Sequence, residues 1–123
     1  MIRKVAATAG LAVALTSGVA AYKSARNDAR ATRDYPPIGQ FISIDGTKVH
    51  YVIEGDGPPL VLIHGAGGNL RDFTFQLTGK LAKTHTVIAF DRPGHGYTQT
   101  LNDHGESLQE QAALLKSATD ALG

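Results

Sequence analysis

The sequence predicts an α/β fold: a β-hairpin, then strand, helix, strand and helix, all preceded by an N-terminal hydrophobic helix. Two observations lead to this prediction. Asp45-Gly46 separates two runs rich in β-formers, which is a strong hairpin signal. Two short apolar runs, Leu60–Ile63 and Thr86–Phe90, each lead into a glycine-rich turn and then into a helical pattern. Alternating strands and helices of this kind favour parallel pairing with covered faces.

The first segment, residues 1–22, is expected to be a membrane anchor or a signal segment. Val5 to Tyr22 carries no charge and follows Arg3 and Lys4. As a helix, these 18 residues would span roughly 27 Å, against about 30 Å of hydrocarbon. A retained anchor, a cleaved signal and a surface-lying helix all stay open. We therefore expect membrane association through residues 5–22, with the side undecided, or a secreted or periplasmic protein if the segment is cleaved.

Residues 23–37 are expected to form a juxtamembrane helix or a linker, and residues 38–123 the folded domain. Lys23 to Tyr35 is polar with mixed charge, and Pro36-Pro37 ends it. In the hairpin, Phe41–Ile44 and Lys48–Ile53 are the expected strands. Because side chains alternate along a strand, we expect His50 to face solvent.

Two helices are expected in the domain. The first begins at Asn69 as N-cap and has apolar positions spaced by three, four and four residues: Leu70, Phe73, Leu77 and Leu81. The second begins with Ser107-Leu-Gln-Glu110, a capping-box pattern, and ends at Gly123. Its expected apolar face consists of Leu108, Ala112, Leu115, Ala118 and Leu122.

Function is expected at the carboxyl ends of the two apolar strands, where open α/β sheets bind ligands. His64-Gly-Ala-Gly-Gly68 follows the first strand, and Asp91-Arg-Pro-Gly-His-Gly-Tyr-Thr98 follows the second. A dinucleotide site is one alternative, since Gly65 and Gly67 could begin its fingerprint. Leu70 stands where the third glycine is required, so that fingerprint is incomplete.

The two turns together resemble the α/β-hydrolase superfamily, over about residues 36–123. His64-Gly-Ala-Gly-Gly68 resembles the family's His-Gly loop, and Asp91–Thr98 resembles its Asp-Arg-Pro-Gly-His-Gly-x-Ser motif, with Thr98 in place of Ser. The resemblance implies the N-terminal half of an α/β-hydrolase sheet. It also implies that the backbone N–H of Ala66 is an oxyanion donor. Gly65 and Gly67 would line the substrate, and a structural motif would comprise His64, Asp91, Gly94, His95 and Gly96.

The family's nucleophile elbow, Gly-x-Ser/Asp-x-Gly, is absent from these 123 residues. We therefore expect an N-terminal fragment, itself inactive. The full protein would hydrolyse an ester or related acyl bond through Ser, or an epoxide or carbon–halogen bond through Asp. A family member without the triad, acting as a binding protein, is the alternative.

The resemblance implies a small-molecule substrate as partner beside the membrane, and the composition argues against a nucleic-acid partner. The net charge is +1, and the basic residues do not form a nucleic-acid footprint. Cysteine is absent, and His85, His95 and His104 lack metal-ligand spacing. No metal and no cofactor are expected.

Overall fold

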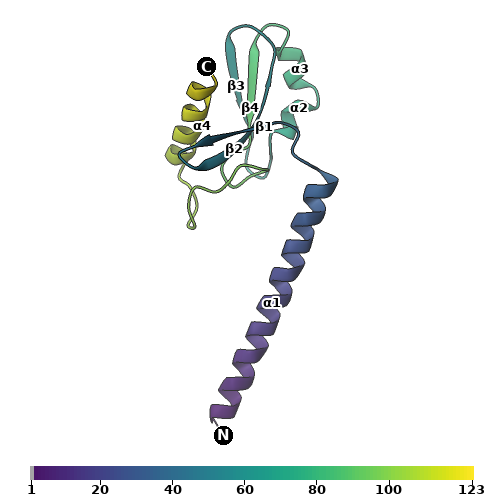
Figure 1. Ribbon diagram of the computed structural model, residues 1–123, viewed down its shortest axis with the longest axis vertical. Coiled ribbons are helices and arrows are strands. Elements are labelled where there is room, and N and C mark those ends of the chain that lie inside the picture. Colours follow the sequence, from purple (N-terminus) through teal and green to yellow (C-terminus); the bar gives the residue numbers. More distant parts are fainter. Residues whose placement is uncertain (1) are drawn as a thin grey trace. The chain divides into compact units, whose positions relative to one another are not determined.

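The computed structural model describes residues 2–123, with side chains described from residue 12 onward. The chain divides into two compact units, one ending at Pro36 and the other running from Pro37 to Gly123. Each unit is described by itself (Figure 1).

The first unit is one helix, α1, from Ile2 to Asp34. It runs without a break across residues 22 and 23, where the sequence predicts a change from hydrophobic segment to linker. Near its end, Arg30 and Arg33 each place Nε within 3.6 Å of the Asp34 carboxylate. No helix among the described residues is long and apolar enough to cross a bilayer. The expected membrane association through residues 5–22 stays a prediction, and residues 5–11 lie outside the described side chains.

The second unit is built on a mixed four-stranded sheet in the order β1-β2-β4-β3. Its strands are β1 (Gln40–Ile44), β2 (Thr47–Glu54), β3 (Pro59–Ile63) and β4 (Thr86–Phe90). β2 pairs antiparallel with β1 and with β4, whereas β3 and β4 are parallel. The predicted α/β class and the two parallel strands are confirmed.

The predicted hairpin is confirmed, and its turn has the expected chemistry. Asp45 and Gly46 have φ angles of 48° and 84°, and β1 pairs with β2 from Ile44 opposite Thr47. Two successive left-handed residues give a turn whose twist matches that of the strands, which is why Asp-Gly is favoured there.

The single helix expected over residues 69–81 is wrong. Two short helices, α2 (Arg71–Thr74) and α3 (Leu77–Leu81), take its place, separated where Gln76 leaves helical geometry at φ −145°. Threonines and Gly79 make this stretch a poor helix former, so packing decides its path. Asn69 still satisfies a helix-start donor, because its Oδ1 accepts from the N–H of Arg71 at 2.9 Å.

The last helix, α4 (Leu108–Leu122), begins and ends as predicted. Both bonds of the capping box between Ser107 and Glu110 are present, and Gly123 ends the helix with φ 84°. The predicted apolar face is wrong at Leu108, which is 74% exposed, and at Ala112, which is also exposed. Leu114 is buried instead, because the buried face is rotated about the helix axis relative to the predicted one.

The sheet lies between α4 on one side and α2 and α3 on the other (Figure 1). The core joins apolar side chains of β2 and β4 to α4: Val49, Tyr51, Ile88, Phe90, Leu114, Leu115 and Ala118. β3 is an edge strand, and Ile63 at its end is 52% exposed. The strand expected to be covered on both faces is therefore only partly covered in this chain.

Candidate functional site

Two turns of the chain meet at the edge of the sheet formed by the ends of β3 and β4. β3 and β4 are parallel and in register, with Ile63 opposite Phe90. His64 and Asp91 are the next residues of each strand, so the two glycine-rich turns start side by side. This edge is the carboxyl end of the parallel pair, where the sequence predicts the functional site.

The first turn presents the backbone of Ala66 to solvent. The N–H of Gly68 donates to the carbonyl of Gly65 at 3.2 Å, and Gly67 between them has φ 74°. This conformation is that of a type II turn, in which the third position favours glycine. Ala66 is exposed, and its N–H makes no hydrogen bond to any residue that the structure describes. A backbone N–H that is not already hydrogen-bonded can bind a negatively charged oxygen.

His64 ties the first turn to the second. Its side chain is 3% exposed. Nδ1 lies 2.8 Å from the carbonyl of Gly65, which can only accept, and Nε2 lies 3.0 Å from the N–H of Arg92, which can only donate. These partners fix a neutral imidazole with the proton on Nδ1. Both ring nitrogens are thereby occupied.

Asp91 is the most heavily bonded side chain at this edge, and it is 1% exposed. Its Oδ1 accepts from the N–H of Leu70 at 2.8 Å. Its Oδ2 accepts from the N–H of Tyr97 at 2.9 Å and lies 2.7 Å from Nδ1 of His50. Burial alone raises the pKa of Asp91, but the hydrogen bonds from His50, Leu70 and Tyr97 outweigh it and lower the pKa below 3.8. The group is a fixed carboxylate that links both turns.

Two glycines of the second turn have left-handed backbone conformations, and one of them also lies against Asp91. Gly94 and Gly96 have φ angles of 72° and 50°. A Cβ on Gly96 would overlap the carboxylate of Asp91, so this glycine lets the chain close around the acid. His95 lies in the same turn, with Nδ1 3.0 Å from the carbonyl of Pro93 and its ring 5.3 Å from that of His64.

The expectation that His50 faces solvent is wrong. The side chain is 2% exposed, and β2 is buried on both faces at Val49, His50 and Tyr51. Alternation assumes that one face of the strand is open. Here α4 covers one face, while Phe41 and Tyr97 lie against the imidazole on the other, with ring centroids at 5.0 and 5.5 Å. The sequence offers no signal for this, because Asp91 is 41 residues away.

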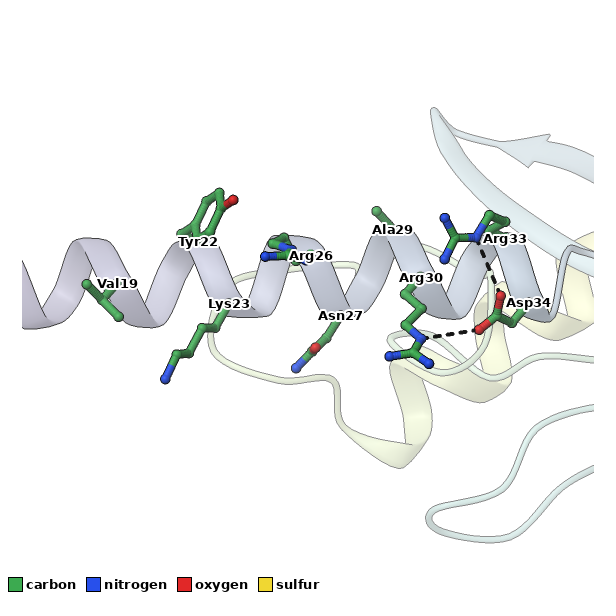
Figure 2. Close-up of a pocket in the computed structure, with 9 residues that line it drawn as sticks. All are labelled: Val19, Tyr22, Lys23, Arg26, Asn27, Ala29, Arg30, Arg33 and Asp34. Atoms are coloured by element: carbon green, nitrogen blue, oxygen red, sulfur yellow. Dashed lines mark ion pairs between the residues drawn. The ribbon is translucent and has the colours of Figure 1, made fainter.

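Other parts of the described chain offer less chemistry. No group of three or more potential metal ligands occurs among the residues described. An open hollow runs along one side of α1, and Figure 2 shows Arg30 and Arg33 reaching toward Asp34 within it. Its polar groups are surface charges rather than buried, fixed donors, so the strand-end turns remain the candidate site.

The comparisons with known proteins agree with this geometry. The family model for the α/β-hydrolase fold matches residues 58–123, just over half of the chain and including both turns. The chain belongs to the α/β-hydrolase-fold family. The dinucleotide-binding alternative is therefore dropped.

Similar proteins include enzymes acting on different bonds. The acetyltransferase component of an acetoin cleaving system from Cupriavidus necator is 38% identical over 85% of this chain and 28% of its own length. A pyrrolizixenacetamide deacetylase from Xenorhabdus hominickii is 35% identical over 65% and 30%. The solved structure of the Cif epoxide hydrolase from Acinetobacter nosocomialis is 32% identical, with a TM-score of 0.62 over 67% of this chain and 25% of that one. The chain thus spans less than a third of each of these relatives.

Proposed function

We propose that these residues form the N-terminal part of a hydrolase that cleaves an ester or related acyl bond, or an epoxide or carbon–halogen bond. The observation that carries the proposal is the N–H of Ala66, which no described residue bonds, in the first of the two turns that His64 ties together. The relatives support the acyl and epoxide parts of this range, since they include a deacetylase and an epoxide hydrolase.

In this proposal Ala66 supplies one donor of an oxyanion hole. Attack on an ester carbonyl creates a tetrahedral oxyanion, and fixed N–H groups aimed at it stabilise the transition state more than the ground state. Gly65 and Gly67 on either side leave space for substrate, because no atom lies within 4 Å of a Cβ built on either. His64 keeps the loop in place through its two ring nitrogens.

The remaining catalytic groups would come from chain outside these 123 residues. They are a Ser or Asp nucleophile, which would form a covalent intermediate, and the acid and histidine base of the triad. His64 cannot serve as that base in the described arrangement, since both its nitrogens are hydrogen-bonded. Asp91 is likewise committed to holding the two turns.

The test compares Ala66→Pro with Ala66→Gly in the complete protein. Proline removes the N–H, whereas glycine keeps it. Proline should lower kcat by roughly a hundredfold or more with a smaller change in KM, and glycine should change kcat little. With an Asp nucleophile, proline should instead slow the second step and let the covalent intermediate accumulate, which mass spectrometry detects.

Two outcomes would contradict the proposal. A correctly folded Ala66→Pro variant with wild-type turnover would exclude the oxyanion role. A complete protein without a Ser or Asp at the elbow position, and without hydrolysis of aryl esters or epoxides, would support the binding-protein alternative instead.

A further inference from the structure

His50 lies at the centre of a buried network that the proposed reaction does not use directly. It sits on β2, and its ring and its backbone N–H bond to the start of the domain and to the turn after β4. Nε2 is 3.1 Å from the N–H of Gly39, and Nδ1 is 2.7 Å from Oδ2 of Asp91. The backbone N–H of His50 donates to Oγ1 of Thr98 at 2.9 Å. The residue therefore connects the start of the domain with the turn after β4.

The hydrogen-bond partners determine the charge and tautomer of this imidazole. A backbone N–H such as that of Gly39 can only donate, so Nε2 must accept and carries no proton. The proton of the neutral ring is then on Nδ1, from which it donates to Asp91. The contact is a hydrogen bond from a neutral ring to a carboxylate, which is stronger than one between neutral groups.

Asp91 transmits this contact to the loop that carries Ala66. Its other oxygen accepts from the N–H of Leu70, four residues after Ala66. His50 and the N–H of Tyr97 both donate to Oδ2, so without His50 the carboxylate keeps only one backbone donor on each oxygen and is held less firmly. His50 is the only side-chain donor to Asp91 among the described residues, and the others are backbone N–H groups of the turns themselves.

We propose that His50 is a positioning residue for the oxyanion loop: through Asp91 it fixes where the Leu70 end of that loop lies, and so the direction of the Ala66 N–H. The inference rests on the proposed function for its catalytic consequence alone. A donor displaced by as little as about half an ångström loses much of its effect on a transition state. A side chain that never touches substrate can therefore change the rate.

Two substitutions at His50 separate its two ring contacts. The amide nitrogen of asparagine lies where Nδ1 lies, so His50→Asn keeps a donor for Asp91 and loses the acceptor for Gly39. The amide oxygen of glutamine lies near Nε2, so His50→Gln keeps the acceptor and loses the donor. Matched controls are the same substitutions at His104, which is exposed.

The measurements are made on the complete protein. In His50→Gln, hydrogen exchange at the N–H groups of Leu70 and Tyr97 should speed up about tenfold, the effect of losing one hydrogen bond to a charged group. Its kcat should fall about tenfold with KM changed less, while His50→Asn should stay within about threefold of wild type in both readouts.

The exchange measurement separates this inference from the proposed function, because it requires no catalysis. If the wild-type protein lacks hydrolase activity, the proposed function fails, yet the Leu70 and Tyr97 amides still test the role of His50. Equal effects of His50→Asn and His50→Gln, including loss of the folded state in both, would overturn the inference. So would wild-type exchange and wild-type kcat in His50→Gln.

Discussion

Replacing Asp91 with asparagine tests the link between the two turns most directly. The substitution keeps the shape of the side chain and exchanges one acceptor oxygen for an NH2 group. In the wild-type protein the two oxygens accept from three donors, which come from His50, Leu70 and Tyr97. Asparagine has one acceptor oxygen, so either orientation of the amide leaves at least one of these donors facing an NH2 group.

The size of the effect follows from counting donors. With the amide oxygen in the place of Oδ2, the bonds from His50 and Tyr97 survive and the Leu70 N–H loses its partner. In the other orientation, two donors are orphaned. The first orientation is thus preferred, and one buried unsatisfied donor plus a lost bond to a charged group corresponds to about 2–4 kcal/mol. That is a large share of the roughly 5–15 kcal/mol that stabilises a typical protein.

Guanidinium unfolding of the complete protein measures this loss, with Asp120→Asn as the control. Asp120 pairs with Lys116 on the exposed surface of α4, and its substitution should change the free energy of unfolding by roughly 0.5 kcal/mol or less. An Asp91→Asn variant within that same margin would refute the account of Asp91 as the link between the turns.

The stability difference between wild type and Asp91→Asn should also depend on pH, in a direction set by the pKa of Asp91. The pKa of Asp91 is lower in the folded protein than its ordinary value of 3.8. Its contribution to stability is therefore present above pH 3.8 and is lost as the pH falls through the lower, folded-state pKa. The stability difference between wild type and Asp91→Asn should narrow below pH 3.8, and a difference that widens there would contradict the assignment.

Three further predictions concern the second turn, the cap of α4 and the edge strand β3. Gly96→Ala should lower the free energy of unfolding by about 3 kcal/mol or more, because Gly96 has positive φ and its Cβ would meet the carboxylate of Asp91. Gly67→Ala is the control: Gly67 also has positive φ but open space around a Cβ, so guanidinium unfolding should show a loss of only roughly 1–2 kcal/mol. Ser107→Ala removes the capping box and should lose about 1 kcal/mol in that assay. Residues 1–123 expressed alone should self-associate through the open edge of β3 and show no aryl-ester hydrolysis, so a monomer in analytical ultracentrifugation would count against this.

Local signals explain which elements the sequence predicts well. Asp45-Gly46 and the Ser107–Glu110 pattern each specify their own backbone conformation within four residues, and both elements form as expected. The interrupted helix between Leu70 and Leu81 is the opposite case. Its apolar spacing is helical, but weak helix formers leave the backbone to tertiary packing, which bends it at Gln76.

The candidate site shows the same contrast between local signals and contacts made by distant residues. The glycine-rich turns are visible in the sequence because each follows a short apolar strand, and the parallel register brings them together. The bonds that hold them are not visible, because they join residues far apart in the chain. His50 shows the difference: its place on a strand can be predicted, but its burial depends on Tyr97 and on the turn that closes over it.

The two kinds of residue at this sheet edge should respond differently to substitution. His64 and Asp91 are buried, have their polar atoms occupied and hold the turns, so their loss should appear first as reduced stability. Ala66 is exposed and contributes a backbone N–H that no described residue uses, so its loss should appear in kcat with stability less affected. His50 connects the two groups, because it reaches the loop only through Asp91. Its donor should therefore influence both quantities, and a change in kcat that exceeds the change in stability would separate positioning from general support of the fold.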